Sequence, residues 1–141
     1  MADLSNYLEE EVLNTYLRAG TATVPTNTYL AIFDDTATDA ELEAGTLTNE
    51  ITSYTGDRPQ VDNVLAAASQ ESGAAQVTTN ADIDYEDMPS GTVKWAAVMD
   101  AATGGNVLAY AQSTDDGGNG TPVSAGATFR IASGDFTFSL D

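Results

Sequence analysis

Apolar residues near the start of the chain recur with the period of a helix. In residues 4–19 they fall at about i, i+4, i+8 and i+12 and form one stripe, so the sequence predicts an amphipathic helix there. The stripe consists of Leu4, Tyr7, Leu8, Val12, Tyr16 and Leu17. Glu9–Glu11 stand in the first half, where the helix dipole favours negative charge, and Gly20 is expected to end the helix.

Beyond position 20 the apolar residues form short runs separated by glycine, proline, aspartate and asparagine, which is typical of strands joined by turns. These runs predict strands at residues 28–34, 61–69, 74–85, 92–99, 107–112, 128–133 and 135–141. The last two strands are expected to form a hairpin that turns at Ser133 and Gly134. Residues 35–50, with room for one short helical turn, and residues 113–126 are expected to be surface loops.

The strands at 92–99 and 107–112 are more apolar than a strictly alternating pattern, as expected for a hairpin buried in the middle of a sandwich. Between them, Asp100–Asn106 includes two adjacent glycines and polar residues that tolerate tight turns. The sequence therefore predicts a mainly β fold, an antiparallel β-sandwich with one N-terminal α-helix, in a single domain over residues 1–141.

The composition excludes several classes of function. The chain has no cysteine and no histidine, so thiolate chemistry, disulfides and the commonest general base and metal ligand are absent. It has 22 acidic and 4 basic residues and a net charge of −18, which disfavours binding to nucleic acid or to an anionic membrane surface. The N-terminal sequence lacks the pattern of a secretory signal, and no apolar run is long enough to predict a transmembrane helix.

Clusters of acidic residues occur at 34–43, 84–87 and 115–120. Paired carboxylates can act in glycosidases and acidic loops can bind cations, but a chain with 22 acids forms such clusters by chance, and the last one lacks the register of a calcium loop. Lys94 and Arg130 are expected to pair with neighbouring carboxylates. No catalytic, cofactor-binding or metal-binding residue is predicted.

The aromatic residues of the predicted strands allow two interpretations. They could form a stacking platform for sugars, or they could be core residues, and aromatics at this spacing in strands favour the core. The residues concerned are Tyr85, Trp95, Tyr110 and Phe129.

The stripe of the predicted helix needs a surface to cover. It either covers one end of this chain's own sandwich or docks on a neighbouring subunit. For the second case, Leu4, Tyr7 and Leu8 are the predicted subunit-interface residues, and residues 1–7 are the segment expected to reach the neighbour.

Several segments resemble a family of small virion proteins of tailed viruses, including phages and viruses of haloarchaea. The similar segments cover most of the chain. They are LSNYLEEEVLNTYLRAGT followed by PTNTYLAIF, EITSYTGDRPQV, TVKWAAVMDAATGGNVLAYA and VSAGATFRIASGDFTFSLD.

The resemblance implies a non-enzymatic virion structural protein with a β-sandwich fold. The favoured hypothesis is a capsid decoration protein on the head exterior, a homotrimer that binds the major capsid protein without cofactors. Two alternatives remain open: a minor tail, neck or baseplate component, and a receptor- or glycan-binding module displayed on the virion through the loops at 35–49 and 113–126.

The scarcity of lysine among widely spread acids predicts a surface adapted to concentrated salt, and hence a halophilic source. Because the Debye length falls from about 10 Å at 0.1 M to about 3 Å at 1 M salt, repulsion among the acids should weaken as salt is added. We therefore expect the melting temperature of the purified chain to rise from low to molar NaCl. A melting temperature that stays constant or falls over this range would contradict the prediction.

Overall fold

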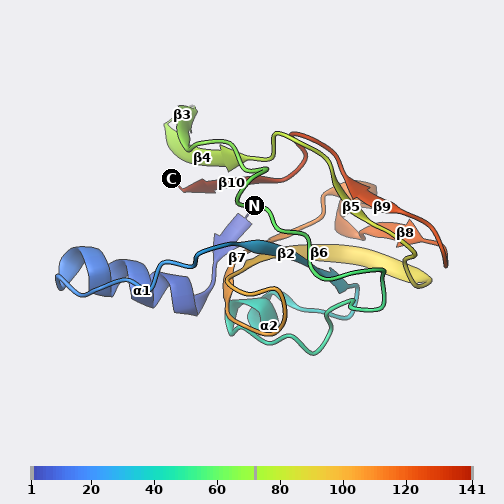
Figure 1. The fold of residues 1–141 in the computed structure, drawn as a ribbon, viewed down its shortest axis with the longest axis horizontal. Coiled ribbons are helices and arrows are strands. Elements are labelled where there is room, and N and C mark those ends of the chain that lie inside the picture. Colours follow the sequence, from blue (N-terminus) through green and yellow to red (C-terminus); the bar gives the residue numbers. More distant parts are fainter. Residues whose placement is uncertain (1, 72, 141) are drawn as a thin grey trace.

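The main β layer is a five-stranded antiparallel sheet, seen in a computed structural model that describes residues 2–71 and 73–140 (Figure 1). Strand β6 lies in the middle of this sheet and pairs with β2 on one side and with β7 and β8 on the other. The strands of the sheet are β1 (Ala2–Leu4), β7 (Val107–Gln112), β6 (Gly91–Met99), β2 (Tyr29–Asp34) and β8 (Thr121–Val123). The predicted central hairpin is thus confirmed as the pair β6 and β7.

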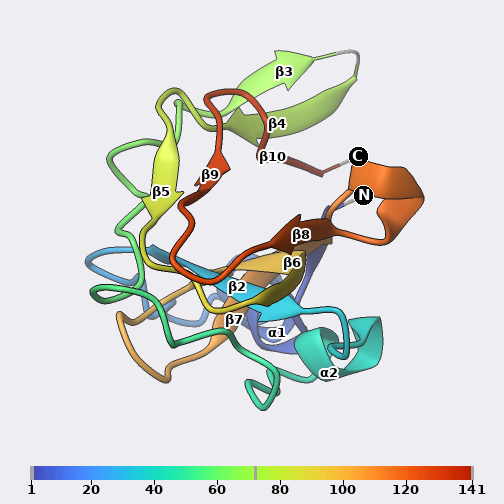
Figure 2. The same cartoon turned by 90° about the vertical axis from the view of Figure 1, so that its right-hand side faces the viewer.

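The second layer lies above the main sheet and is a bent ribbon of short strands (Figure 2). Strand β10 pairs with β4, which also pairs with β3, and β9 pairs with β5. These strands are β3 (Ser69–Glu71), β4 (Ala74–Thr78), β5 (Ile83–Tyr85), β9 (Phe129–Ile131) and β10 (Thr137–Leu140). Together the layers confirm the predicted mainly β, sandwich-like fold with an N-terminal helix.

Three details of the predicted strands are wrong. Residues 74–85, predicted as one strand, form two strands, β4 and β5, in different sheets. The last two strands do not form a hairpin with each other, because β9 and β10 each pair with an earlier strand, on either side of a bend where the Thr79 amide donates to Phe136 O. Residues 61–68 do not form a strand either. This segment makes only isolated backbone hydrogen bonds to its neighbours, and Val61 packs in the core.

Besides the strands, the described residues contain three short helical segments. Helix α1 (Asn6–Leu17) is confirmed but is shorter than predicted, because β1 takes up Leu4. Helix α2 (Asp39–Glu43) is the helical turn expected in the acidic loop, and it begins with a capping box between Thr38 and Glu41. The 3₁₀ segment η1 (Asp115–Gly118) lies in the loop before β8, a strand that the sequence did not predict. None of the described helices has the length and apolar character needed to cross a membrane.

Apolar side chains pack on both faces of the main sheet. Below it, Phe33, Trp95 and Met99 pack against Leu42 of α2. Between the layers lies a second cluster made of Leu30, Ile32, Val61, Ile83, Tyr85, Met88, Val93 and Phe136. The Trp95 indole N–H donates to Ala37 O at 3.0 Å, and the Tyr85 hydroxyl donates to Leu30 O at 3.0 Å, so both polar groups are satisfied inside the core.

A β-bulge at Lys94 divides β6 into two parts. Phe33 of β2 pairs with Trp95, but the next residue of β2, Asp34, pairs with Val93, so Lys94 is an extra residue in β6. As a result Val93 joins the cluster between the layers, whereas Trp95 joins the cluster below the sheet. The bulge lies where β7 ends, and the Ser113 amide donates to Lys94 O at 2.7 Å.

The turn between β6 and β7 is fixed by a buried arginine. The Arg58 guanidinium donates to Ala101 O at 2.9 Å and to Gly104 O at 2.7 Å, and it makes two hydrogen bonds of 2.6 Å to the Glu50 carboxylate. Within the turn, Asp100 accepts from the Asn106 amide at 2.7 Å. The hairpin is thus anchored to the segment that follows α2.

Replacing Arg58 by alanine should lower the free energy of unfolding by about 3–5 kcal/mol, because it leaves the Glu50 carboxylate buried without its partner. The two side chains are only 4% and 7% exposed. Chemical denaturation monitored by Trp95 fluorescence measures the change. The matched control is Arg130→Ala, which removes the exposed ion pairs to Asp82 and Asp84 and should cost far less. Equal losses for the two variants would contradict this account.

Candidate assembly interface

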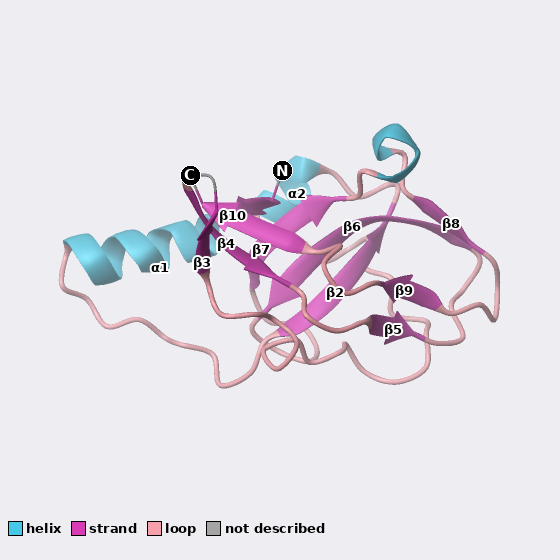
Figure 3. Ribbon diagram, turned by 90° about the horizontal axis from the view of Figure 1, so that it is seen from above, coloured by secondary structure: helices cyan, strands magenta, loops and turns pink. Residues whose placement is uncertain are grey.

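Helix α1 extends away from the two layers, so that its second half projects beyond them (Figures 1 and 3). None of its residues is buried, and its outer part carries four exposed apolar side chains, which we call the ridge: Val12, Leu13, Tyr16 and Leu17. Tyr16 is 81% exposed and Leu17 is 76% exposed. Val24, on the segment that returns from the helix, is also exposed.

The base of α1 is tied firmly to β7. The Ser5 amide donates to Leu108 O at 3.0 Å, and the Ser5 hydroxyl donates to Val107 O. The same hydroxyl caps the helix by accepting from the Leu8 amide at 3.3 Å. Ser5 is therefore buried and sets the direction in which the helix leaves the sheet.

The far end of α1 turns back at Ala19 and Gly20. Ala19 takes the left-handed conformation expected of Gly20, with φ of 53°, and the Gly20 amide donates to Asn14 O at 2.9 Å. A β-carbon at Gly20 would meet that oxygen at 2.9 Å, which explains the glycine. The returning segment is held beside the helix where the Thr23 amide donates to Glu11 at 3.2 Å.

The predicted interface residues lie at the base of the helix and not on the ridge. Leu4 is in β1, opposite Ala109 of β7, and Tyr7 and Leu8 are in the first turn of α1. All three are half-buried against their own chain, and Met1 lies outside the described residues. Their role between subunits stays a prediction. The ridge belongs to the same predicted stripe, but only the structure shows that the stripe's outer half is uncovered.

An isolated helix of this length is marginally stable, and most helices in proteins are stabilised by packing of their apolar face. Helix α1 has 12 residues, and its ridge packs on no part of the described chain deeply enough to be buried. The stripe was expected to cover either this chain's own sandwich or a neighbouring subunit. The sandwich covers only the base of the helix. The ridge has the properties of a docking surface.

A cleft of about 750 Å³ opens between the layers on the side of β8 and η1. Its floor includes Ala96 and Ala111, which pair across β6 and β7 and leave space because their side chains are small. Val123, Phe129 and Ile131 line it from β8 and β9, and Lys94 lines it from the bulge. We call this space the interlayer cleft.

Lys94 lacks the partner that the sequence predicted for it. Among the described residues it makes no ion pair, whereas Arg130 is paired as predicted, with hydrogen bonds of 2.6 and 2.8 Å to Asp84. Those hydrogen bonds hold the pKa of the Asp84 carboxyl below its ordinary value. Lys94 is thus a cation in a cleft that still has room for an acidic partner.

The aromatic residues considered as a binding platform belong to the core. Tyr85, Trp95 and Tyr110 are buried and Phe129 is half-buried, so they are core residues as predicted and form no exposed platform. Burial raises the pKa of Tyr85 well above its ordinary value and raises that of Tyr54, its edge-on neighbour, to about 12. Residues 2–71 and 73–140 contain no group of three potential metal ligands.

Polar substitution of the ridge should leave the isolated chain as stable as before. For Tyr16→Gln with Leu17→Gln we expect a change of at most about 0.5 kcal/mol in the free energy of unfolding, because both side chains are exposed. In the control Met99→Ala, a fully buried side chain is truncated, which should cost about 2–5 kcal/mol. Denaturant titration compares them. A large loss from the ridge variant would show that the ridge packs within its own chain.

Comparison with known proteins relates nearly the whole chain to one family. The family described as Podophage GP4 fiber I protein gp80 matches residues 3–139. No curated protein matches the chain. The family match confirms the predicted relationship to virion proteins of tailed viruses, although it does not confirm the capsid exterior as the location. The chain belongs to the family of the podophage GP4 fiber I protein gp80.

Proposed function

We propose that this chain is a non-catalytic structural subunit of the tail fibre of a tailed virus and that it joins its neighbours through α1. The observation that carries the proposal is the exposed ridge of Val12, Leu13, Tyr16 and Leu17 on a helix that extends away from the folded layers. A surface of this kind needs a protein partner to cover it.

The description of the family supports the tail over the head. It names a fibre protein of a podophage, and the matched region includes the whole of α1 and nearly all of both β layers. The sequence had favoured capsid decoration, with the major capsid protein as partner and a homotrimeric state. Neither that partner nor that state has been tested, and the family's fibre description agrees better with the alternative of a tail component.

Composition supports a role in adhesion and not in catalysis. The chain has no histidine or cysteine, and its exposed carboxylates near Arg130 are engaged in ion pairs. Its net charge of −18 would be unfavourable beside packaged DNA, and so it suits an external position on the virion. Stacking of glycans is less well supported. Among the described residues Tyr16 is the one exposed aromatic side chain, and it belongs to the ridge.

The location is tested by labelling intact virions with gold-conjugated antibodies raised against the purified chain. We expect label at the tail and a copy number in the tens by quantitative mass spectrometry, since tail parts are far fewer than capsid subunits. A virion-free sample of the host provides the background.

Label spread evenly over the heads, with a copy number comparable to that of the capsid subunit, would contradict the fibre assignment. It would restore capsid decoration as the function. Absence of the chain from purified virions would contradict both.

A further inference from the structure

We propose that the ridge of one copy of this chain occupies the interlayer cleft of a second copy. The inference rests on the proposed structural role, because it names the partner of α1. It assigns a use to two features that a single chain leaves open: an uncovered apolar helix and a partly filled space between the layers.

The two features lie at different ends of β7. Ser5, at the base of α1, bonds to Val107 and Leu108 at the start of the strand, whereas Ala111 and Gln112 at its end line the cleft. Helix α1 then continues away from the layers (Figure 3). It therefore does not occupy its own cleft, while its ridge is free to reach that of a neighbour.

The floor of the cleft can receive the apolar side chains of the ridge, while much of the remaining lining is polar. On α1 the apolar residues form two pairs at i and i+4 spacing, Val12 with Tyr16 and Leu13 with Leu17, which lie side by side on a helix. The cleft has an apolar floor at Ala96 and Ala111. Its volume of about 750 Å³ lies within the range of sites that enclose a ligand, which suits the side chains of one helix face.

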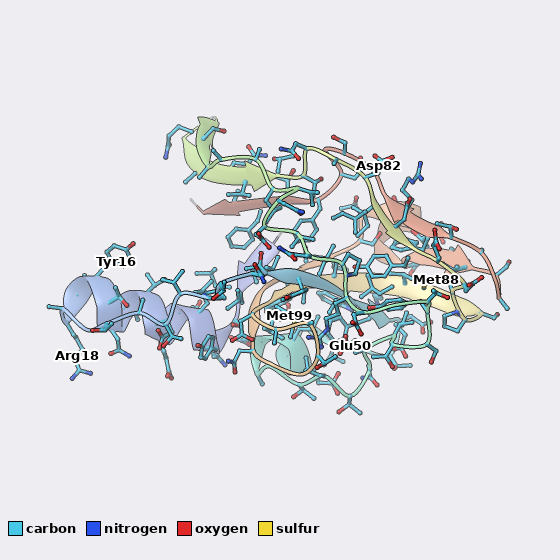
Figure 4. All side chains as sticks on the ribbon, viewed as in Figure 1. Tyr16, Arg18, Glu50, Asp82, Met88 and Met99 are labelled. Atoms are coloured by element: carbon cyan, nitrogen blue, oxygen red, sulfur yellow. The ribbon has the colours of Figure 1, made fainter. Side chains whose placement is uncertain are left out.

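The charges agree with this pairing. The other three cations of the chain are already engaged: Arg58 with Glu50, Arg130 with Asp82 and Asp84, and Arg18 in a hydrogen bond to Asn14. Figure 4 shows Arg18 on the side of α1 opposite to Tyr16, so it points away from the ridge. Lys94 is the cation that remains.

Glutamates flank the ridge. Glu9 and Glu10 are exposed on α1, within one turn before the ridge begins, and either can approach Lys94 when the ridge enters the cleft. Asp115 and Asp135 also line the cleft and would repel these glutamates. Salt screens this repulsion and the attraction to Lys94 alike, but repulsion dominates between two chains of net charge −18, so the contact should strengthen from low to molar salt.

A contact between two different surfaces is heterologous. Each copy offers one ridge and one cleft, so the copies join head to tail and either close into a ring or extend as a filament. A closed ring of three copies would be the homotrimer predicted from the sequence. Copies that do not close into a ring would extend as a filament, which is the geometry of a fibre.

Mixing two variants tests the proposal directly. The ridge variant carries Tyr16→Gln and Leu17→Gln, and the cleft variant carries Ala111→Phe, which fills the floor without changing the charge. In 1 M NaCl, sedimentation velocity should show oligomers for the wild-type chain and monomers for each variant alone. The mixture should give a 1:1 dimer and nothing larger, because it holds one intact ridge and one intact cleft.

A second cleft variant tests the charge. Lys94→Glu should weaken the association by roughly tenfold or more, because it places a like charge opposite Glu9 and Glu10. The control Arg18→Glu changes the charge of the chain equally but lies away from the ridge, and it should leave the association nearly unchanged. Circular dichroism of every variant checks that each is folded.

Three results would overturn the proposal. They are a wild-type chain that stays monomeric at all concentrations and salts, a cleft variant that assembles like the wild type, and a mixture that forms no dimer. The second result would mean that ridges pack on ridges. None of these results alters the labelling of virions, so the location on the particle is judged independently.

Discussion

Strand β6 is the element on which the rest of the structure depends, because it pairs on both sides and carries core residues on both faces. The bulge at Lys94 lets neighbouring positions of one strand serve two cores: Val93 faces the second layer and Trp95 faces α2. The bulge lies between the part of β6 that pairs with β7 and the part that pairs with β8, next to the loop that contains η1. The interlayer cleft opens on this side, over the small side chains of Ala96 and Ala111 and beside Lys94.

The proposed adhesive role rests on the surface that this arrangement leaves uncovered. The buried ion pair of Arg58 and Glu50 and the hydrogen bonds of Ser5 fix the hairpin turn and the base of α1. The ridge beyond that base is left exposed by its own chain. In our proposal the fixed base aims the outer half of α1 at a neighbour, and packing against that neighbour stabilises a helix that is marginally stable alone.

Much of the fold could be predicted from local sequence. The helix and the pair β6 and β7 are long and strongly patterned, so period and turn residues identify them. The pairing of β9 with β5 and of β10 with β4 depends on contacts far apart in the chain, which local pattern does not encode. The same limit applies to the interface: the stripe was visible, but Tyr7 and Leu8 resemble Tyr16 and Leu17 in the sequence, and only the direction fixed by Ser5 separates the half-buried base from the exposed ridge.

The central claim is that α1 is completed by a contact outside its own chain. Hydrogen exchange of the α1 backbone amides, compared between the isolated chain at low concentration and the chain in virions, measures this most directly. The account predicts fast exchange along Val12–Leu17 in the isolated chain and strong protection in the virion, while β6 is protected in both. Equal protection of α1 in the two states would contradict it.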